Sequence, residues 1–333
     1  MMQIVVSCDF LISPAFCAHH LFESRINDLI TIKREMEVGG RRVVIEAETL
    51  VKLANLQYYP CAPIFKKNIP PELAEFFSPK DIAKVVHNIA SMTVDQECSL
   101  PESVAYWDTK IINPNLIGCC HERSEGISQL VEEVFLANYI HEKALSILHH
   151  PLEEDIKSID FFGELTHSIP ETQPPAPLTV QNFVPVFSSY TDFLSKFDAS
   201  EAYGKATTQL QIIDAFTLGA ASIAKQHGKN GVFFYTCGDS FFDSLNEHQC
   251  APGQRFANTA FDVICHVVAG VEKYAHKPMY SDLDKKEQIV KDGKCAWRTH
   301  ITKGNPALRL MYWIEEGKII IANVGNKNAL EIF

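Results

Sequence analysis

Residues 297–333 alternate hydrophobic and polar positions in a way that is typical of an antiparallel sheet. Strand character marks three successive segments: Trp297–Thr302, Leu308–Ile314 and Lys318–Val324. Glu315–Gly317 forms a glycine-containing turn between the last two, which predicts a β-hairpin. Alternation gives the middle strand one face with Leu308, Leu310 and Tyr312 and another with Arg309, Met311 and Trp313. Arg309 is therefore expected to project from a sheet, which would hold its guanidinium rigidly.

The residues ahead of these strands predict the elements that cover them. Apolar residues in Phe256–Val271 recur at three- and four-residue intervals, which predicts an amphipathic helix. Gly231–Thr236 reads as a strand and Asp239–Asn246 as a short helix. The C-terminal part is therefore expected to be an α+β domain with an antiparallel meander.

Short motifs in this region resemble the RelE/HigB/ParE toxin superfamily. They are Arg298 before the hairpin, the Arg-x-x-Tyr formed by Arg309 and Tyr312, an Ile-x-x-Val-Gly-x-Lys sequence that ends at Lys327, and the aromatic Phe333. The resemblance covers about a third of the chain. It implies a bacterial toxin, or an anti-phage defence protein, that acts on RNA or on the ribosome. Many members have Tyr where this chain has Phe333, so a terminal phenol is absent here.

The resemblance also implies roles for four residues. Arg309 and Arg298 would hold the scissile phosphate, and Lys327 would add positive charge. His300, an imidazole on the same strands, would activate the ribose 2′-hydroxyl. This chemistry needs no metal and no other cofactor. The alternative is that these basic side chains are solvated surface charges.

The N-terminal part begins with alternating strands and helices. Gln3–Ile12 is a predicted strand, Phe16–Glu37 a helix, Arg42–Ala47 a strand and Glu48–Leu56 a helix. This order opens a βαβ unit and so predicts an α/β domain with a parallel sheet and many helices.

Further elements follow along the same half of the chain. Ser78-Pro79 predicts a helix start, with Ser as N-cap and Pro in the first turn. We expect residues 95–120 to be rich in loops and Ser124–His149 to be the longest helix. Five of the 17 prolines fall in 169–186, which predicts an extended connector. The predicted domains are therefore 1–168 and 187–333.

Acidic residues of the N-terminal half suggest a different chemistry. Ligands of parallel sheets bind at the carboxyl ends of the strands, and the candidates near such ends are Asp9, Glu46, Glu48, Asp95 and Asp108. Carboxylates gathered there would suit Mg²⁺ or Mn²⁺. Their layout is faintly similar to PIN-type nucleases. The segment after Asp9 lacks the Ser, Thr or Asn usual in that family. Carboxylates that cap helices or face solvent are the alternative.

Composition limits the function classes. The net charge is −11, which argues against indiscriminate nucleic-acid binding. Residues 229–333 hold 13 Lys and Arg against 12 Asp and Glu, so the acidity lies in the rest of the chain. The ten cysteines show no regular pairs of the C-x-x-C kind, as expected for reduced thiols, although scattered Cys and His leave a zinc site open. We expect a cytoplasmic protein without a membrane partner.

Three functions remain open at this point. The first is the RNA-directed toxin or defence protein, acting as a ribonuclease. The second is the metal-dependent nuclease built on the N-terminal carboxylates. The third is a non-enzymatic assembly or sensor subunit of a defence complex, with an antitoxin or a defence-complex protein as its partner.

Overall fold

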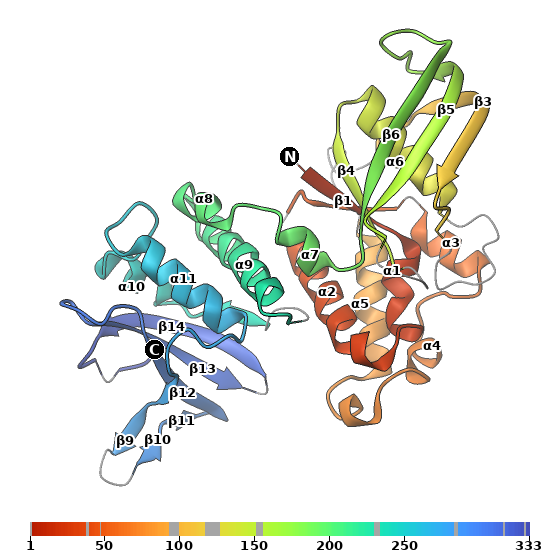
Figure 1. The fold of residues 1–333 in the computed structure, drawn as a ribbon. Coiled ribbons are helices and arrows are strands. Elements are labelled where there is room, and N and C mark those ends of the chain that lie inside the picture. The colour runs from red at the N-terminus through yellow and green to blue at the C-terminus, as the bar shows by residue number, and fades with distance from the viewer. Residues whose placement is uncertain are drawn as a thin grey trace. The chain divides into compact units, whose positions relative to one another are not determined.

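The computed structural model describes residues 2–37, 40–46, 48–92, 100–116, 127–150, 156–229, 234–282, 286–315, 317–329 and 331–333. The chain is a mixed α/β protein (Figure 1). Its contacts divide it into two compact units, Met1–Phe193 and Leu194–Phe333, which are described separately below. In the described residues, no helix is both long enough and apolar enough to cross a membrane.

The N-terminal unit is built on a six-stranded sheet. In spatial order its strands are β2 (Val43–Ile45), β1 (Met2–Val6), β4 (Ala144–Leu148), β6 (Leu178–Phe187), β5 (Ser158–Ile169) and β3 (Val104–Asn113). β1 pairs in parallel with both β2 and β4, and β4 pairs in parallel with β6. β6, β5 and β3 pair antiparallel. The predicted βαβ opening is therefore present as β1–α2–β2.

Helices cover this sheet and extend beside it. They are α1 (Cys8–Ile12), α2 (His19–Glu37), α3 (Thr49–Asn55), α4 (Ala62–Lys66), α5 (Pro79–Ser91), α6 (Ser128–Ile140) and α7 (Tyr190–Leu194), with short 3-10 turns at Ser13–Ala15 and Pro71–Leu73. α6 packs on the antiparallel strands, where the ring of Phe135 stacks 4.0 Å from that of Phe161. The predicted start of α5 is confirmed, because Ser78 Oγ accepts a hydrogen bond from the Lys80 amide.

The predicted first strand is too long. β1 ends at Val6, and Cys8–Ile12 turns into helix α1 instead of continuing the strand. Ser7 causes the change, because its hydroxyl accepts a hydrogen bond from the Phe10 amide and so caps the helix. Asp9 consequently lies in the first turn of α1.

Three further predictions for this unit are wrong. The helix expected over Ser124–His149 ends at Ile140, and strand β4 takes its place. The stretch 95–120 contains strand β3, and the proline-rich stretch 169–186 contains most of β6. The division between units therefore falls at residues 193 and 194, after the expected connector. An apolar run such as that of β4 fits a buried strand and a helix equally well, so periodicity alone misassigns it.

The C-terminal unit begins with helices and ends with a sheet. Its helices are α8 (Ala199–Gly204), α9 (Gln209–Gln226), α10 (Phe241–Glu247) and α11 (Ala257–Val268). Its strands are β7 (Tyr235–Cys237), β8 (Lys277–Pro278), β9 (Tyr280–Asp282), β10 (Glu287–Gln288), β11 (Val290–Lys291), β12 (Lys294–His300), β13 (Leu308–Glu315) and β14 (Lys318–Asn326). The main sheet has the order β11-β12-β13-β14-β7, and β8 pairs with β12.

The C-terminal meander is confirmed. β12, β13 and β14 pair antiparallel in succession, and the β13–β14 hairpin closes with Glu315 opposite Lys318. Figure 1 shows α10 and α11 over one face of this sheet. Leu308, Leu310 and Tyr312 are almost fully buried, whereas Met311 and Trp313 join a separate apolar cluster with Met279, Ala296 and Ala322. The two faces of β13 therefore divide as the alternation predicts.

Candidate functional site

Basic side chains meet on one face of the C-terminal sheet. His300 of β12 lies directly opposite Arg309 of β13, and Arg298 lies opposite Met311, the neighbour of Arg309 on the same face. On its other side Arg298 pairs with Lys277 of β8. Residues opposite one another in antiparallel strands point to the same side, so these side chains share the face of Met311 and Trp313.

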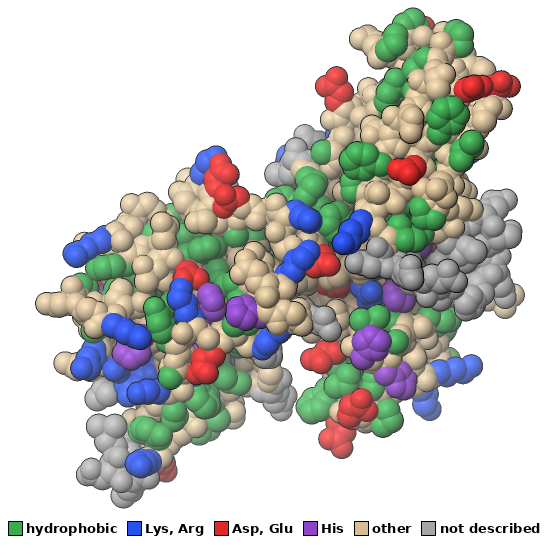
Figure 2. All heavy atoms as spheres, viewed as in Figure 1, with side chains coloured by type: hydrophobic (Ala, Val, Ile, Leu, Met, Phe, Trp, Pro, Cys, Tyr) green, Lys and Arg blue, Asp and Glu red, His purple; other side chains and the backbone are tan. Residues whose placement is uncertain are grey.

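We call Lys277, Arg298, His300, Lys303 and Arg309 the cationic cluster. Lys303 follows β12 and belongs to it because its charge lowers the pKa of His300, as do those of Arg309 and Lys277. Figure 2 shows Lys, Arg and His side chains on the visible face of the C-terminal unit, with Asp and Glu side chains among them. Sequence reasoning found Arg298, His300 and Arg309 but missed the two lysines.

The cluster lacks acidic partners. Within the described ranges, no carboxylate forms an ion pair with any of its four Lys and Arg side chains. The Lys303 ammonium instead lies 4.7 Å from the ring centroid of Tyr274. Burial, and then Arg298, lowers the pKa of Arg309, which remains a cation. The face therefore carries concentrated positive charge that an anion can neutralise.

The guanidinium of Arg309 is held by the backbone of the next turn. Its Nη1 donates a 3.0 Å hydrogen bond to the carbonyl oxygen of Lys327, whose own amide donates to Ala307. The Lys327 side chain is exposed, and its charge is not among those that shift the pKa of His300 or Arg309. Lys327 therefore positions Arg309 through its main chain.

The tail after β14 turns back across this same face. Gly325 lies opposite Arg309, and a Cβ there would come within 2.6 Å of Met311 Cε and 3.0 Å of Ala329 Cβ. Further on, Trp313 Nε1 donates a 3.1 Å hydrogen bond to the Phe333 carbonyl oxygen. Phe333 as a whole is 63% exposed, and its backbone oxygen makes the contact with Trp313.

His300 is suited to accept a proton. Burial is the largest cause that lowers its pKa, and the neighbouring cations add to it. Its Nδ1 is buried, and a hydrogen bond with the Thr302 backbone opposes the shift without reversing it. The imidazole is therefore neutral near pH 7, which is the form that a general base requires.

The N-terminal carboxylates do not gather in the same way. Glu46 is buried after β2, where its Oε2 accepts from the Cys8 amide at 2.8 Å and its Oε1 from Lys52 Nζ at 3.0 Å. Glu48 is exposed, and Asp108 is exposed on β3, an edge strand that three others separate from β1. Asp95 lies outside the described residues.

The metal hypothesis requires at least three carboxylates around one point. Among residues that the structure describes, no group of three or more Asp, Glu, His or Cys side chains is placed to hold a metal ion. Asp9 is fully buried in α1, and the amide of the preceding residue, Cys8, donates to Glu46. Two acids are fewer than the three that the metal alternative requires. Of the scattered Cys and His residues that left a zinc site open, Cys119, Cys120 and His121 lie outside the described residues.

A histidine pair lies at the carboxyl end of β4, where sequence reasoning predicted the end of a helix. His149 and His150 follow this strand directly, and His149 Nδ1 lies 3.1 Å from Ser7 Oγ at the end of β1. Both histidines are buried, and burial lowers the pKa of His150 to about 4. The chain leaves β1 toward β2 on one side and returns at β4 on the other, a switch point where α/β proteins commonly bind ligands.

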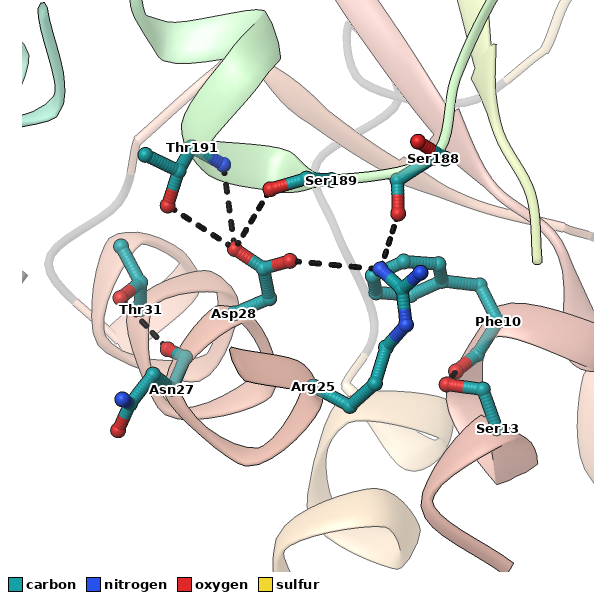
Figure 3. A network of polar contacts seen from close by, with 9 residues as sticks. All are labelled: Phe10, Ser13, Arg25, Asn27, Asp28, Thr31, Ser188, Ser189 and Thr191. Carbon is teal, nitrogen blue, oxygen red and sulfur yellow. Dashed lines mark hydrogen bonds and ion pairs between the residues drawn. The ribbon is translucent and has the colours of Figure 1, made fainter. Parts of the chain in front are cut away.

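A buried ion pair lies beside this edge (Figure 3). Asp28 Oδ1 accepts hydrogen bonds from the amide and hydroxyl of Thr191, both at 3.1 Å. Arg25 lies 3.7 Å from Asp28 Oδ2, donates to the Ser188 carbonyl and sits 5.2 Å from the Phe10 ring centroid. Burial raises the pKa of Asp28, and Arg25 opposes that shift. The network ties α2 to the chain that follows β6.

Comparison with known proteins adds no relative: no family model, no curated protein and no solved structure matches this chain. The arguments that follow therefore rest on the residues and their geometry.

Proposed function

We propose that the C-terminal unit binds the RNA backbone through the cationic cluster and that the protein is an RNA-directed toxin or anti-phage defence protein. The observation that carries this is the set of four Lys and Arg side chains around His300 without an acidic partner in the described residues. Arg and Lys are the side chains that hold phosphate. The net charge of −11 favours binding at this face over general attraction to nucleic acid.

The arrangement supports cleavage as well as binding. In the proposed step, neutral His300 takes the proton of a ribose 2′-hydroxyl, and the 2′-oxygen attacks the adjacent phosphorus. A cyclic phosphate forms, the bond to the 5′-oxygen breaks, and that oxygen takes a proton from water. Arg309 and Arg298 would stabilise the negative charge that develops on the phosphate. The step needs a 2′-hydroxyl, so RNA and not DNA is the expected substrate.

A binding role without cleavage is the second candidate, and one observation favours it. Phe333 provides no phenol, and its backbone oxygen is engaged by Trp313, so no acid is evident for the leaving oxygen at this position. In that case the cluster would hold RNA for a partner protein, as an assembly or sensor subunit of a defence complex would.

Induced expression and RNA cleavage distinguish these functions. Wild type should arrest growth and cut RNA during translation. Arg309→Ala and Arg309→Lys should both lose roughly 10²–10³ in cleavage rate, because Lys cannot replace a bidentate guanidinium. His300→Gln should lose cleavage but keep RNA binding. Lys291→Ala, which removes an exposed cation of β11 outside the cluster, is the matched control and should behave as wild type.

Each outcome decides between the candidates. Equal growth arrest by wild type and Arg309→Ala would disprove the ribonuclease mechanism. RNA binding that depends on Arg309, without cleavage by wild type, would support the binding subunit. Absence of both RNA binding and growth arrest would reject the proposal altogether.

A further inference from the structure

The N-terminal unit contains an apolar hollow between two neighbouring helices. α2 and α5 lie side by side, and the hollow between them is partly open to solvent, with a cavity volume of about 90 Å³. Ile26, Leu29 and Ile30 line it from α2, and Ile82 and Val85 line it from α5. This volume is below the roughly 300–1,000 Å³ of sites for drug-sized ligands, so the hollow suits only a small ligand that it encloses in part. The lining favours a ligand with an apolar body.

One end of the hollow is chemically different. Asp81, in the first turn of α5, lines the space with an exposed carboxylate. No described residue forms an ion pair or hydrogen bond with that carboxylate. The other polar residue of the lining, Ser78, is engaged, because its hydroxyl accepts from the Lys80 amide at 3.2 Å. The Asp81 carboxylate therefore lies at one end of an apolar lining, without a partner among the described residues.

Phe76 adds a second feature that attracts cations. Its side chain lines the same hollow and is 74% exposed, whereas that of the neighbouring Phe77 packs edge-on against Phe22 with ring centroids 6.0 Å apart. The face of an aromatic ring attracts an ammonium group. The amino end of α5 carries about half a positive charge, which the full negative charge of Asp81 exceeds. Lys80 and Lys84 do not line the hollow.

We propose that this hollow binds a small apolar amine, with its hydrocarbon or aromatic body between α2 and α5 and its ammonium group at Asp81 and Phe76. The site is distinct from the cationic cluster, which belongs to the other unit and attracts anions. A ligand there would contact α2, the helix that carries Arg25 and Asp28.

Calorimetric titration of the full chain with three indoles tests the charge preference. Tryptamine carries an ammonium, indole is neutral and indole-3-acetate is an anion, on the same ring system. We expect tryptamine to bind roughly fivefold more tightly than indole, and indole-3-acetate to bind most weakly. Asp81→Asn should remove the difference between tryptamine and indole. Glu72→Gln, a nearby exposed acid outside the lining, is the control and should preserve it.

Filling the hollow tests its location. Ile30→Trp should abolish binding of all three indoles, and Val85→Trp from the facing helix serves if the first variant does not keep the thermal stability of wild type. Three results would overturn the proposal: no saturable tryptamine binding up to about 10 mM, equal affinity for tryptamine and indole-3-acetate, or undiminished binding by a folded variant with a filled hollow.

Discussion

Arginine side chains have different roles in the two units. They differ between the carboxyl edge of the N-terminal sheet and the cationic face of the C-terminal sheet. At the N-terminal edge, Arg25 is 4% exposed and contacts Asp28, the Ser188 carbonyl and the Phe10 ring. On the C-terminal sheet, Arg298 and Arg309 are half-buried and have no acidic partner in the described residues. A buried, paired arginine holds the fold together, whereas an accessible and unpaired one leaves its charge for a ligand.

The largest expected effect is the loss of stability when the buried Arg25–Asp28 ion pair is broken. Arg25→Ala leaves Asp28 buried without its cation, and removal of one partner from a buried pair typically costs about 3–5 kcal/mol. The free energy of unfolding, from urea titration, should fall by that amount. Arg298→Ala is the matched control and should change it by less than about 0.5 kcal/mol. A loss below about 1 kcal/mol for Arg25→Ala would mean that the network is not structural.

Acid should destabilise the N-terminal unit through His150. Its folded pKa is about 4, against an ordinary value of 6.5. Between those two values the unfolded chain binds a proton that folded His150 does not, so stability is present above pH 6.5 and is lost as the pH falls toward 4. The loss should be on the order of 3 kcal/mol. Urea titrations across this range should show it, and His150→Gln should lack it.

The pKa of His300 is also lowered, so its contribution has the same sign. His300 is only half-buried, and solvent reduces the effect. His300→Gln should therefore remove less of the acid dependence of stability than His150→Gln does. If the two substitutions removed equal amounts, the distinction between the two regions would be wrong.

RNA binding should respond to single cations of the cluster in a graded way. Arg298→Ala and Lys277→Ala should each reduce the slope of log affinity against log salt by about 0.7, the value for one phosphate contact with a single strand. Fluorescence anisotropy with a labelled single-stranded RNA measures this. Neither variant should lose stability. An unchanged salt slope for both would place the phosphate contacts elsewhere.

The smallest effect is expected from Lys327→Ala. The contact of Lys327 with Arg309 is made by its carbonyl oxygen, which the substitution keeps. RNA affinity should therefore change by less than about twofold. A loss as large as that of Arg298→Ala would show that the Lys327 ammonium also reaches the RNA.

Sequence patterns predicted the C-terminal sheet well because its strands are long and alternate. Arg309, Arg298 and His300 come together simply because the register of β12 and β13 carries them to one face. Lys277 escaped prediction because β8 has two residues and offers no period to detect. Lys303 lies outside the strands, and only folding brings its charge near His300.

The N-terminal sheet was harder to predict, for a physical reason. β4 is buried, so its sequence is an apolar run without alternation, and it was merged with the preceding helix. That error hid the placement of His149 and His150 at the end of a parallel strand. Two adjacent histidines after an apolar run of five residues were the available signal. The Arg25–Asp28 pair had none, because its partners at residues 188–191 are remote in sequence.

Gly325 has a consequence for how the C-terminal sheet tolerates substitution. The three atoms nearest to a methyl group there would be Met311 Cε, Ala329 Cβ and Asn323 Nδ2, and none of them is charged. The chain just beyond Gly325 supplies the carbonyl that orients Arg309. A replacement by Ala would have to turn the end of the Met311 side chain and shift Ala329 by a few tenths of an ångström. Within this segment, a saturation scan should therefore find a loss of stability at Gly325 that grows with the size of the side chain, at a position that a survey of charged residues alone would overlook.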